Sequence, residues 1–385
     1  MDLVRDYAFG RLERTAEGQL VLSPKQVFKA AEFSRAYHSG ISAEEAEIAK
    51  PLQDAVRGNG FPIIDDGGEI VRPGDFDLLR DFIGILYSLP QEILRKYPGD
   101  QRTYGFVDRG EESYVVDSLK VPEVWKRGFY LSKVWKDGEL GLPLEGIPWG
   151  ADLDSLSQPD RKFYEEFVQQ DYLRLDSSLH HLATLVNNAV GKYCLGLESG
   201  HFDGAFFQGH NNRGFGVGRL LQYVRDQGAK VGDIIAGPHE DTFPSALVKT
   251  LWGNTPISSL EALLPDGTYA AIAYGGKNRY SWNFGWSLFI YALHKHHVDR
   301  NKIEEIMETR DLSLVPEHLR EKVGFPTTHR VIRRDNPDNP LPPTLAKEEQ
   351  ERLSLAFFSG MEPRTWLGTG TFQKVTNRDF SRYVE

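Results

Sequence analysis

Residues 232–247 read GDIIAGPHEDTFPSAL, with a strand-like apolar run before His239 and an aspartate two positions after it. In a β-strand, residues i and i+2 point to the same face, so His239 and Asp241 can offer two ligands to one ion. A histidine from another strand would complete a two-histidine, one-carboxylate facial triad. Such a triad leaves open coordination positions and suits non-haem Fe(II). On these residues alone, a turn histidine beside a turn aspartate stays an open alternative.

Two other His-x-Asp copies compete with this one. His201 and Asp203 follow a predicted helix end, where Asp203 is expected to open a turn. His297 and Asp299 precede a helical pattern, and Asp299 suits the N-cap because its carboxylate accepts from free amides of the first turn. Both of these pairs are therefore interpreted as structural.

The chain further downstream supplies a third ligand and a carboxylate-binding pair. His329 begins a strand-like run, TTHRVI at 327–332. Arg352 and Ser354 share one face of a later strand, and an arginine fork beside a hydroxyl suits a carboxylate. A second Arg-x-Ser, at Arg279 and Ser281, lies before His329 in a glycine-rich stretch, so Arg352 and Ser354 are preferred.

The composition is that of a globular protein with a sizeable core. The chain has 385 residues, of which 40% are hydrophobic and 26% charged. Its net charge of −10 argues against a dedicated nucleic-acid binder, which normally has a basic surface. The single cysteine, Cys194, excludes an intrachain disulfide and a zinc site built from several cysteines, so a cytoplasmic protein is expected. No apolar run approaches the roughly 18 residues of a membrane span, and the N-terminus lacks a signal-peptide pattern, so no membrane partner is expected.

The hydrophobic pattern changes near residue 202. Before that point, helical spacing predicts helices over 43–57, 76–87 and 160–194. After it, short apolar runs alternate with Gly, Asn and Asp turns, which indicates an antiparallel sandwich or barrel. A helical pattern over 301–323 interrupts the second half, whose predicted strands lie at 204–208, 217–224, 268–274, 282–291, 330–332 and 353–358. The predicted fold class is mainly β with flanking α, with a helix-rich N-terminal half.

Taken in order, these motifs resemble those of the isopenicillin N synthase-like family of Fe(II)/2-oxoglutarate-dependent dioxygenases. The family order is His-x-Asp, then His-Arg-Val, then Arg-x-Ser followed by two aromatics, found here at 239–241, 329–331 and 352–358. Weaker similarities, such as Asn283-Phe284-Gly285, extend the match over about residues 50 to 375.

One departure from the family concerns the third ligand. The interval between His239 and His329 is longer than family habit, because of the helical stretch near 294–325. His296 or His297 would lie at a more usual distance from His239. His329 is preferred because it is followed by Arg-Val and leads on to Arg-x-Ser.

The resemblance implies a double-stranded β-helix, or jelly roll, with flanking helices. Residues 201–375 would form this core, with an insertion at about 294–325. Residues 1–200 would form a helix-rich part packed on the core, and 376–385 a C-terminal tail. The insertion ends directly before His329, so it is expected to be a lid over the substrate entrance or, alternatively, a surface or oligomer-contact helix.

The resemblance also implies an activity. His239, Asp241 and His329 would bind Fe(II), 2-oxoglutarate would chelate it, and O2 would take the remaining position. Arg352 and Ser354 would bind the distal carboxylate of 2-oxoglutarate, with Tyr223 nearby. A ferryl intermediate would then hydroxylate, desaturate or cyclise a small-molecule substrate, in specialised metabolism. The oligomeric state is left open.

Two rival interpretations remain. Some members of the family use no 2-oxoglutarate, and there the Arg-x-Ser pair holds the carboxylate of the substrate. The chain could also be a jelly-roll metal- or ligand-binding module without redox chemistry.

Overall fold

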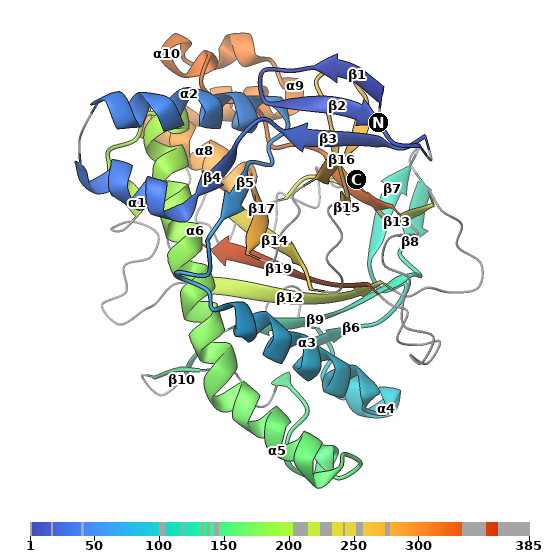
Figure 1. Cartoon of the computed structure of the whole chain (residues 1–385). Coiled ribbons are helices and arrows are strands. Elements are labelled where there is room, and N and C mark those ends of the chain that lie inside the picture. Colours follow the sequence, from blue (N-terminus) through green and yellow to red (C-terminus); the bar gives the residue numbers. More distant parts are fainter. Residues whose placement is uncertain are drawn as a thin grey trace.

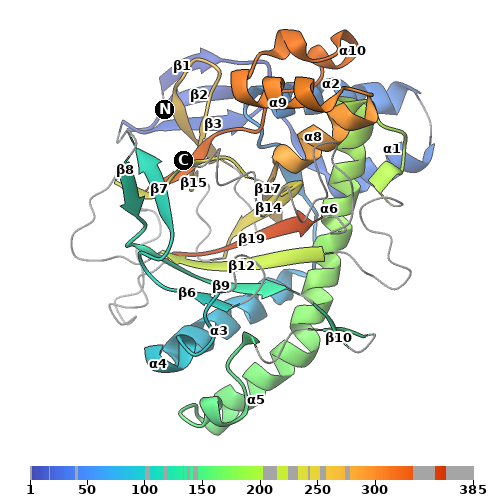
Figure 2. The same cartoon turned by 180° about the vertical axis from the view of Figure 1, so that it is seen from behind.

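The computed structural model describes residues 2–16, 18–39, 42–99, 105–116, 119–132, 134–136, 139–141, 146–202, 215–223, 233–241, 243–251, 257–273, 278–332 and 352–360. Over these residues the fold consists of two large β-sheets, two small hairpins and a set of helices (Figure 1, and from behind in Figure 2). The prediction of a mainly β protein with flanking helices is confirmed. Within the described residues, no helix has both the length and the apolar content to span a bilayer.

The seven-stranded sheet carries both predicted histidine ligands. Its pairings are antiparallel except that β3 and β16 run parallel. Its order is β1 (Asp2–Asp6), β2 (Gly10–Arg14), β3 (Leu20–Pro24), β16 (Tyr269–Ala273), β15 (Ile257–Leu263), β18 (His329–Ile332) and β13 (Ile234–His239).

The eight-stranded sheet carries the predicted Arg-x-Ser strand, β19. Its pairings are antiparallel except that β4 and β5 run parallel. Its order is β4 (Val27–Lys29), β5 (Ile63–Asp65), β17 (Arg279–Phe284), β14 (Ser245–Thr250), β19 (Arg352–Gly360), β12 (Phe215–Tyr223), β9 (Lys126–Ser132) and β6 (Gly105–Val107).

The two sheets pack against each other through one apolar cluster. Leu22, Ile235 and Leu260 reach it from the seven-stranded sheet, and Leu221 and Ala356 from the eight-stranded sheet. Because strand side chains alternate between faces, the opposite face of the eight-stranded sheet is left to a second cluster. That cluster contains Leu220, Leu355 and Phe357, among others.

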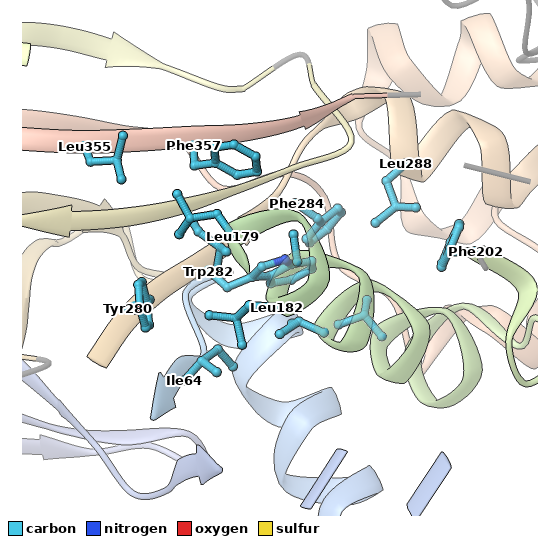
Figure 3. Packing of buried hydrophobic residues seen from close by; sticks show 14 of the residues in the cluster. Ile64, Leu179, Leu182, Phe202, Tyr280, Trp282, Phe284, Leu288, Leu355 and Phe357 are labelled. Atoms are coloured by element: carbon cyan, nitrogen blue, oxygen red, sulfur yellow. The ribbon is translucent and has the colours of Figure 1, made fainter. Parts of the chain in front are cut away.

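Helices cover this second face. The long helix α6 (Tyr172–Leu195) contacts β12, β14 and β19, and also α1 (Ala30–Ser39) and α2 (Ser42–Gly58). In Figure 3, Leu179 and Leu182 of α6 lie beside Trp282 of β17. The Trp282 indole donates to Asn187 Oδ1 at 3.2 Å, so the buried ring is also satisfied as a donor.

Most of the predicted helices are confirmed. The pattern over 43–57 is α2, that over 76–87 is α3 (Pro73–Ser88), and α4 (Gln91–Leu94) follows. The long pattern over 160–194 is α5 (Gln158–Glu166), a π-helical turn (Phe167–Asp171) and α6. Gly196 ends α6 in the left-handed conformation that glycine favours.

The helix-rich N-terminal half is not confirmed. The described residues of 2–29 include the four strands β1 to β4, which join the two large sheets, and β5, β6 and β9 belong to the eight-stranded sheet. The remaining strands of this half are β7 (Ser113–Val116), β8 (Leu119–Pro122), β10 (Val134–Lys136) and β11 (Glu139–Gly141). Strands from both sides of residue 200 therefore share sheets. The strands β1 to β4 were not predicted, because each is too short to show a sustained alternation.

The predicted strand over 282–291 is wrong in its second part. The strand β17 ends at Phe284, and α8 (Trp286–Lys295) follows directly after Gly285. Residues Trp286 to Leu293 of α8 are all buried. A helix buried on every side has no polar face, so its short apolar run cannot be told from a buried strand by periodicity.

The insertion packs on the rest of the molecule. It contains the end of α8, then α9 (Arg300–Thr309), a 3-10 turn (Leu312–Leu314) and α10 (Glu317–Arg320). Its apolar residues Ile303, Val315 and Leu319 belong to the large helix-side cluster. Both α9 and α10 lie at the same end of the molecule as α2 (Figure 2). The lid function stays a prediction.

Some predictions fall outside the described residues. These are the strand over 204–208 and the tail 376–385.

Candidate metal centre

The structure brings His239, Asp241 and His329 together. His239 is the last residue of β13 and His329 the first of β18, and the two are antiparallel partners in register. Their ring centroids are 4.3 Å apart. Asp241 lies two residues beyond the strand end, with Oδ2 at 3.7 Å from His329 Nε2. One ligand atom from each of the three lies within 4.8 Å of the other two.

Both imidazoles are oriented by the backbone. His239 Nδ1 lies 2.8 Å from the carbonyl oxygen of Gly237, and His329 Nδ1 lies 3.0 Å from that of Thr327. A carbonyl oxygen only accepts, so each Nδ1 is the donor, and in the neutral tautomer that makes this bond the lone pair lies on Nε2. Such carbonyl contacts typically fix the tautomer of metal-binding histidines.

The site also favours the neutral, ligating form of one histidine. Burial, and then the neighbouring His329, lower the pKa of His239 to about 4. His329 itself is 5% exposed, and Phe61 packs edge-on against its ring with centroids 5.3 Å apart.

Asp241 is held by the corner where β17 passes into α8. Asn283 Nδ2 donates to Asp241 Oδ2, and the backbone N–H of Trp286 donates to the Asp241 carbonyl at 3.0 Å. Between these residues, a Cβ on Gly285 would meet the Asp241 carbonyl oxygen at 2.4 Å and the Phe243 carbonyl oxygen at 2.1 Å. Only glycine lets the corner approach the aspartate this closely.

The predicted carboxylate-binding residues lie on the opposite sheet. Ser354 pairs with Leu221, and Arg352 pairs with Tyr223, across β19 and β12. Ser354 shares a strand face with Ala356, so it faces the space between the sheets, as Tyr223 does. Ser354 is 2% exposed, and its Oγ has no hydrogen-bond partner within the described part of the chain. The side chain of Arg352 lies outside the described residues.

The competing residues have other roles. His201 Nε2 contacts the hydroxyl of Tyr291 at 2.7 Å, and Asp203 lies outside the described residues. Asp299 caps α9, as predicted, by accepting from Lys302 N at 3.0 Å. His296 contacts the Leu195 carbonyl oxygen at 2.7 Å. In the described ranges, His239, Asp241 and His329 form the one group that could hold a metal ion.

Both residues of the second Arg-x-Ser, Arg279 and Ser281, have partners within the chain. Arg279 pairs with Asp65 at 3.1 Å, and Ser281 Oγ lies 3.5 Å from the Val248 carbonyl oxygen.

Solved structures match this chain, although no protein-family model and no curated protein sequence does. A full-length Neurospora crassa protein in complex with alpha-KG and 5-formyluracil has a TM-score of 0.58 and 15% identity, over 97% of this chain and 99% of its own. A putative 2OG-Fe(II) oxygenase family protein from Caulobacter crescentus has a TM-score of 0.57 and 17% identity, over 94% and 99%. JOX2 in complex with 2OG, Fe and JA has a TM-score of 0.53 and 16% identity, over 91% and 79%.

The chain has the fold of the 2OG-Fe(II) oxygenases. The predicted resemblance is confirmed for this wider group and its jelly-roll fold, and the support does not extend to the narrower isopenicillin N synthase-like group. At this level of identity the likeness is one of fold. The two large sheets are the open sheets of the jelly roll, and the candidate ligands lie at the end of β13 and the start of β18.

A largely buried charge cluster that sequence reasoning missed borders the candidate metal centre. Glu112 accepts from Tyr130 at 2.7 Å and pairs with Lys126 at 2.7 Å and with Arg219. Lys126 also pairs with Glu123.

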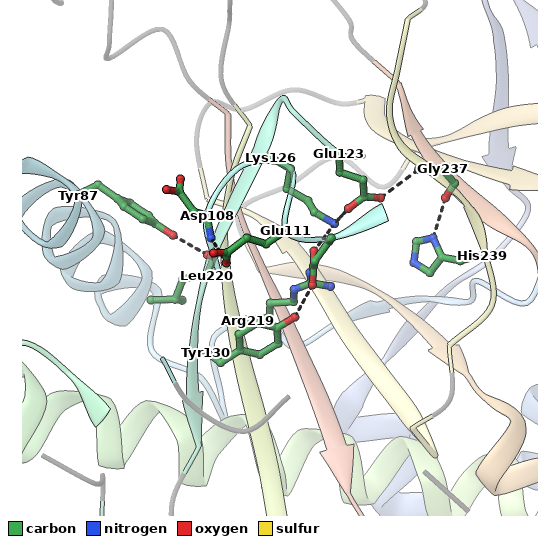
Figure 4. Close-up of polar contacts among 11 residues, drawn as sticks. Tyr87, Asp108, Glu111, Glu123, Lys126, Tyr130, Arg219, Leu220, Gly237 and His239 are labelled. Carbon is green, nitrogen blue, oxygen red and sulfur yellow. Dashed lines mark hydrogen bonds and ion pairs between the residues drawn. The ribbon is translucent and has the colours of Figure 1, made fainter. Parts of the chain in front are cut away.

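The cluster reaches the ligand strand through one residue, Gly237. Glu123 accepts from the N–H of Gly237 at 3.3 Å, and the carbonyl of the same glycine faces His239 (Figure 4). The ring of Tyr114 on β7 lies against Gly237 so closely that a Cβ there would meet it at 1.9 Å. These partners are far apart in sequence, so no local sequence pattern predicts their contacts.

Proposed function

We propose that this chain is a non-haem Fe(II)- and 2-oxoglutarate-dependent oxygenase that oxidises a small-molecule substrate. The observation that carries the proposal is the triad itself. Two imidazoles with Nδ1 committed to carbonyls and one carboxylate have ligand atoms within 4.8 Å of one another. Two histidines and one carboxylate with open positions are the ligand set of non-haem Fe(II) oxygenases.

The donor set fits the implied metal and cosubstrate. His239, Asp241 and His329 would hold Fe(II), and Ser354, Tyr223 and Arg352 would hold the distal carboxylate of 2-oxoglutarate. The hydroxyls of Ser245, Ser354 and Ser359 are all buried without a partner among the described residues. Ser354 supports this assignment because it faces the space between the two sheets, whereas Ser245 and Ser359 lie on the helix-covered face. When bound, Fe(II) and 2-oxoglutarate together supply the oxidising equivalents from O2.

The residues of the chain would bind the metal and the cosubstrate, orient the metal ligands and exclude water. Gly237 and Thr327 hold the two imidazoles in one tautomer, and Asn283 orients the carboxylate of Asp241. The apolar cluster between the sheets, which includes Leu221, limits access of solvent to this space. Water exclusion strengthens the electrostatic interactions inside a site and suppresses side reactions.

The proposed substrate is a small molecule, in specialised metabolism. Structural neighbours carry 5-formyluracil in one case and JA in another. Hydroxylation, desaturation and ring formation are the outcomes considered, because the outcome depends on how the substrate carbon is held.

The test is an anaerobic titration of the protein with Fe(II) and 2-oxoglutarate. We expect a weak visible charge-transfer band that needs both additions and is absent in Asp241→Ala. A band without 2-oxoglutarate dependence, or none at all with Fe(II) bound, contradicts the proposal.

The products of turnover distinguish a 2-oxoglutarate-dependent oxygenase from an oxidase that uses no 2-oxoglutarate. A 2-oxoglutarate-dependent enzyme releases succinate and CO2 in the presence of Fe(II) and O2. Substrate oxidation without succinate would identify the oxidase that uses no 2-oxoglutarate. Metal binding without any O2 consumption would identify a binding module.

A further inference from the structure

Glu240, the residue between two candidate ligands, has a carboxylate with three donors. Trp286 Nε1 donates to Oε2 at 2.8 Å, Thr328 Oγ1 donates to Oε1 at 2.6 Å, and Arg310 Nη2 pairs with Oε1 at 2.5 Å. The Glu240 side chain is 17% exposed. A side chain at this position could face solvent freely, yet this one is fixed at both carboxylate oxygens.

Two of the three donors belong to segments that carry or hold the other ligands. Thr328 directly precedes His329. Trp286 also donates its backbone N–H to the carbonyl of Asp241 at 3.0 Å. The carboxylate of Glu240 therefore ties its own segment, with His239 and Asp241, to the segment with His329.

The third donor, Arg310, comes from the insertion and is itself held in place. It ends α9 in the left-handed conformation, with φ of 53°. Its guanidinium lies 5.6 Å from the ring centroids of Trp286 and Phe325, and it donates to the Pro326 carbonyl at 3.3 Å. Stacking on two aromatic faces beside a carboxylate is a geometry that arginine provides and lysine does not.

We infer that Glu240 is a positioning residue of the metal centre, and that Arg310 couples the insertion to metal binding through it. The inference rests on the proposed function, because it concerns the same three ligands. The carboxylate of Glu240 bonds to Trp286, Thr328 and Arg310 and not to a ligand imidazole, so it acts by fixing the spacing of two backbone segments. An exposed ion pair contributes little, but here the carboxylate is largely buried and both partners are held by further contacts.

The experiment measures metal binding without turnover. CoCl2 is titrated into the full chain under nitrogen, and affinity and the visible Co(II) spectrum are recorded for the wild type, Glu240→Gln, Arg310→Gln and Arg310→Lys. We expect about a tenfold loss of Co(II) affinity in Glu240→Gln and a changed spectrum, within the range for residues that orient metal ligands. Arg310→Gln should bind Co(II) several-fold more weakly than the wild type. Arg310→Lys should recover part of the lost affinity because it restores the charge.

The matched control is Arg300→Gln. It removes the same charge from the same helix, α9, where Arg300 pairs with Glu304 on the surface at 2.8 Å. We expect its Co(II) affinity to equal that of the wild type. An equal loss in Arg300→Gln would overturn the inference, because the effect would then be one of net charge.

A second measurement tests the inference without a Glu240 variant, in case Glu240→Gln does not fold. In the wild type, Co(II) should slow hydrogen exchange over 300–310, and Arg310→Gln should abolish this slowing. No slowing in the wild type, or wild-type affinity and spectrum in a folded Glu240→Gln, overturns the inference. Failure of the wild type to bind Co(II) at all contradicts the proposed function instead.

Discussion

His329 is the candidate ligand with the most constrained surroundings. It is the direct strand partner of His239, and Phe61 packs against its ring. We expect His329→Ala to abolish turnover and to weaken Co(II) binding by at least a hundredfold, because loss of an imidazole opens the facial triad. Isothermal titration under nitrogen would measure it.

The control for this prediction is His297→Asn. His297 is exposed and has φ of 59°, and asparagine tolerates that left-handed conformation better than alanine does. We expect wild-type activity and affinity from it. Loss in His297→Asn with full activity in His329→Ala would reverse the assignment of the third ligand.

At the residue scale, the sequence predicted the candidate ligands but not the residues that hold them. The i, i+2 spacing of His239 and Asp241 follows from strand geometry, and the motif order led to His329. Neither Asn283 nor Glu240 could be assigned a contact, because their partners depend on how β17 and α8 fold back onto β13.

The corner between β17 and α8 is the element on which the position of Asp241 depends. Gly285→Ala would place a methyl group against two carbonyl oxygens, of Asp241 and Phe243, at 2.4 and 2.1 Å. The backbone must shift, so we expect a destabilisation of roughly 1–3 kcal/mol, typical of overpacking, together with weaker Co(II) binding. Urea unfolding and metal titration would measure the two effects.

Gly84→Ala is the matched control. Gly84 is exposed within α3, and a Cβ there would meet nothing within 4 Å. Since alanine is the better helix former, we expect this variant to gain about 0.5–1 kcal/mol and to bind metal normally. If Gly285→Ala had the stability and the Co(II) affinity of the wild type, the corner would be able to accommodate a Cβ, and the prediction would be wrong.

The charge cluster beside Gly237 predicts a dependence of stability on pH. Burial acts to raise the pKa of Glu112, but the charges of Arg219 and Lys126 outweigh it and hold that pKa well below its usual value. The folded-state pKa thus lies below the unfolded value of 4.5. The stability contributed is present above about pH 4.5 and is lost as pH falls below it.

We therefore expect Glu112→Gln to destabilise the protein at pH 7 by roughly 2 kcal/mol, since it leaves two largely buried cations short of one partner. The difference from the wild type should shrink as pH falls from 4.5 towards 3. Glu304→Gln, which breaks an exposed pair, should cost less than about 0.5 kcal/mol at any pH. A constant Glu112→Gln difference between pH 7 and pH 3 would contradict the electrostatic explanation.

At the element scale, sequence patterns succeeded where one face is polar. The amphipathic helices α2 and α3 were predicted close to their bounds, whereas the fully buried α8 was mistaken for a strand. The strands β1 to β4 were missed because each has five residues or fewer and its burial depends on a sheet formed by distant segments.

At the scale of the whole molecule, the proposed ligands would connect the two sheets. His239 and His329 belong to the seven-stranded sheet, and Ser354 and Tyr223 to the eight-stranded sheet. A metal alone would engage the first sheet with Asp241, and 2-oxoglutarate chelated to it would engage the second. Ligand binding to the folded state should therefore stabilise the whole fold, and in a definite order.

We expect Co(II) alone to raise stability, 2-oxoglutarate alone to change it little, and both together to exceed the sum of the two. At 100 times its dissociation constant, a ligand adds about 2.7 kcal/mol to the free energy of unfolding, which anaerobic urea unfolding resolves.

Ser354→Ala should reduce only the stabilisation by 2-oxoglutarate, by about 1 kcal/mol, the contribution of one hydrogen bond. Ser359→Ala is the matched control, because this buried serine lies on the other face of β19 and should leave both increments unchanged. Equal stabilisation by 2-oxoglutarate with and without Co(II) would mean that the cosubstrate binds away from the metal, and the connection between the sheets would then be wrong.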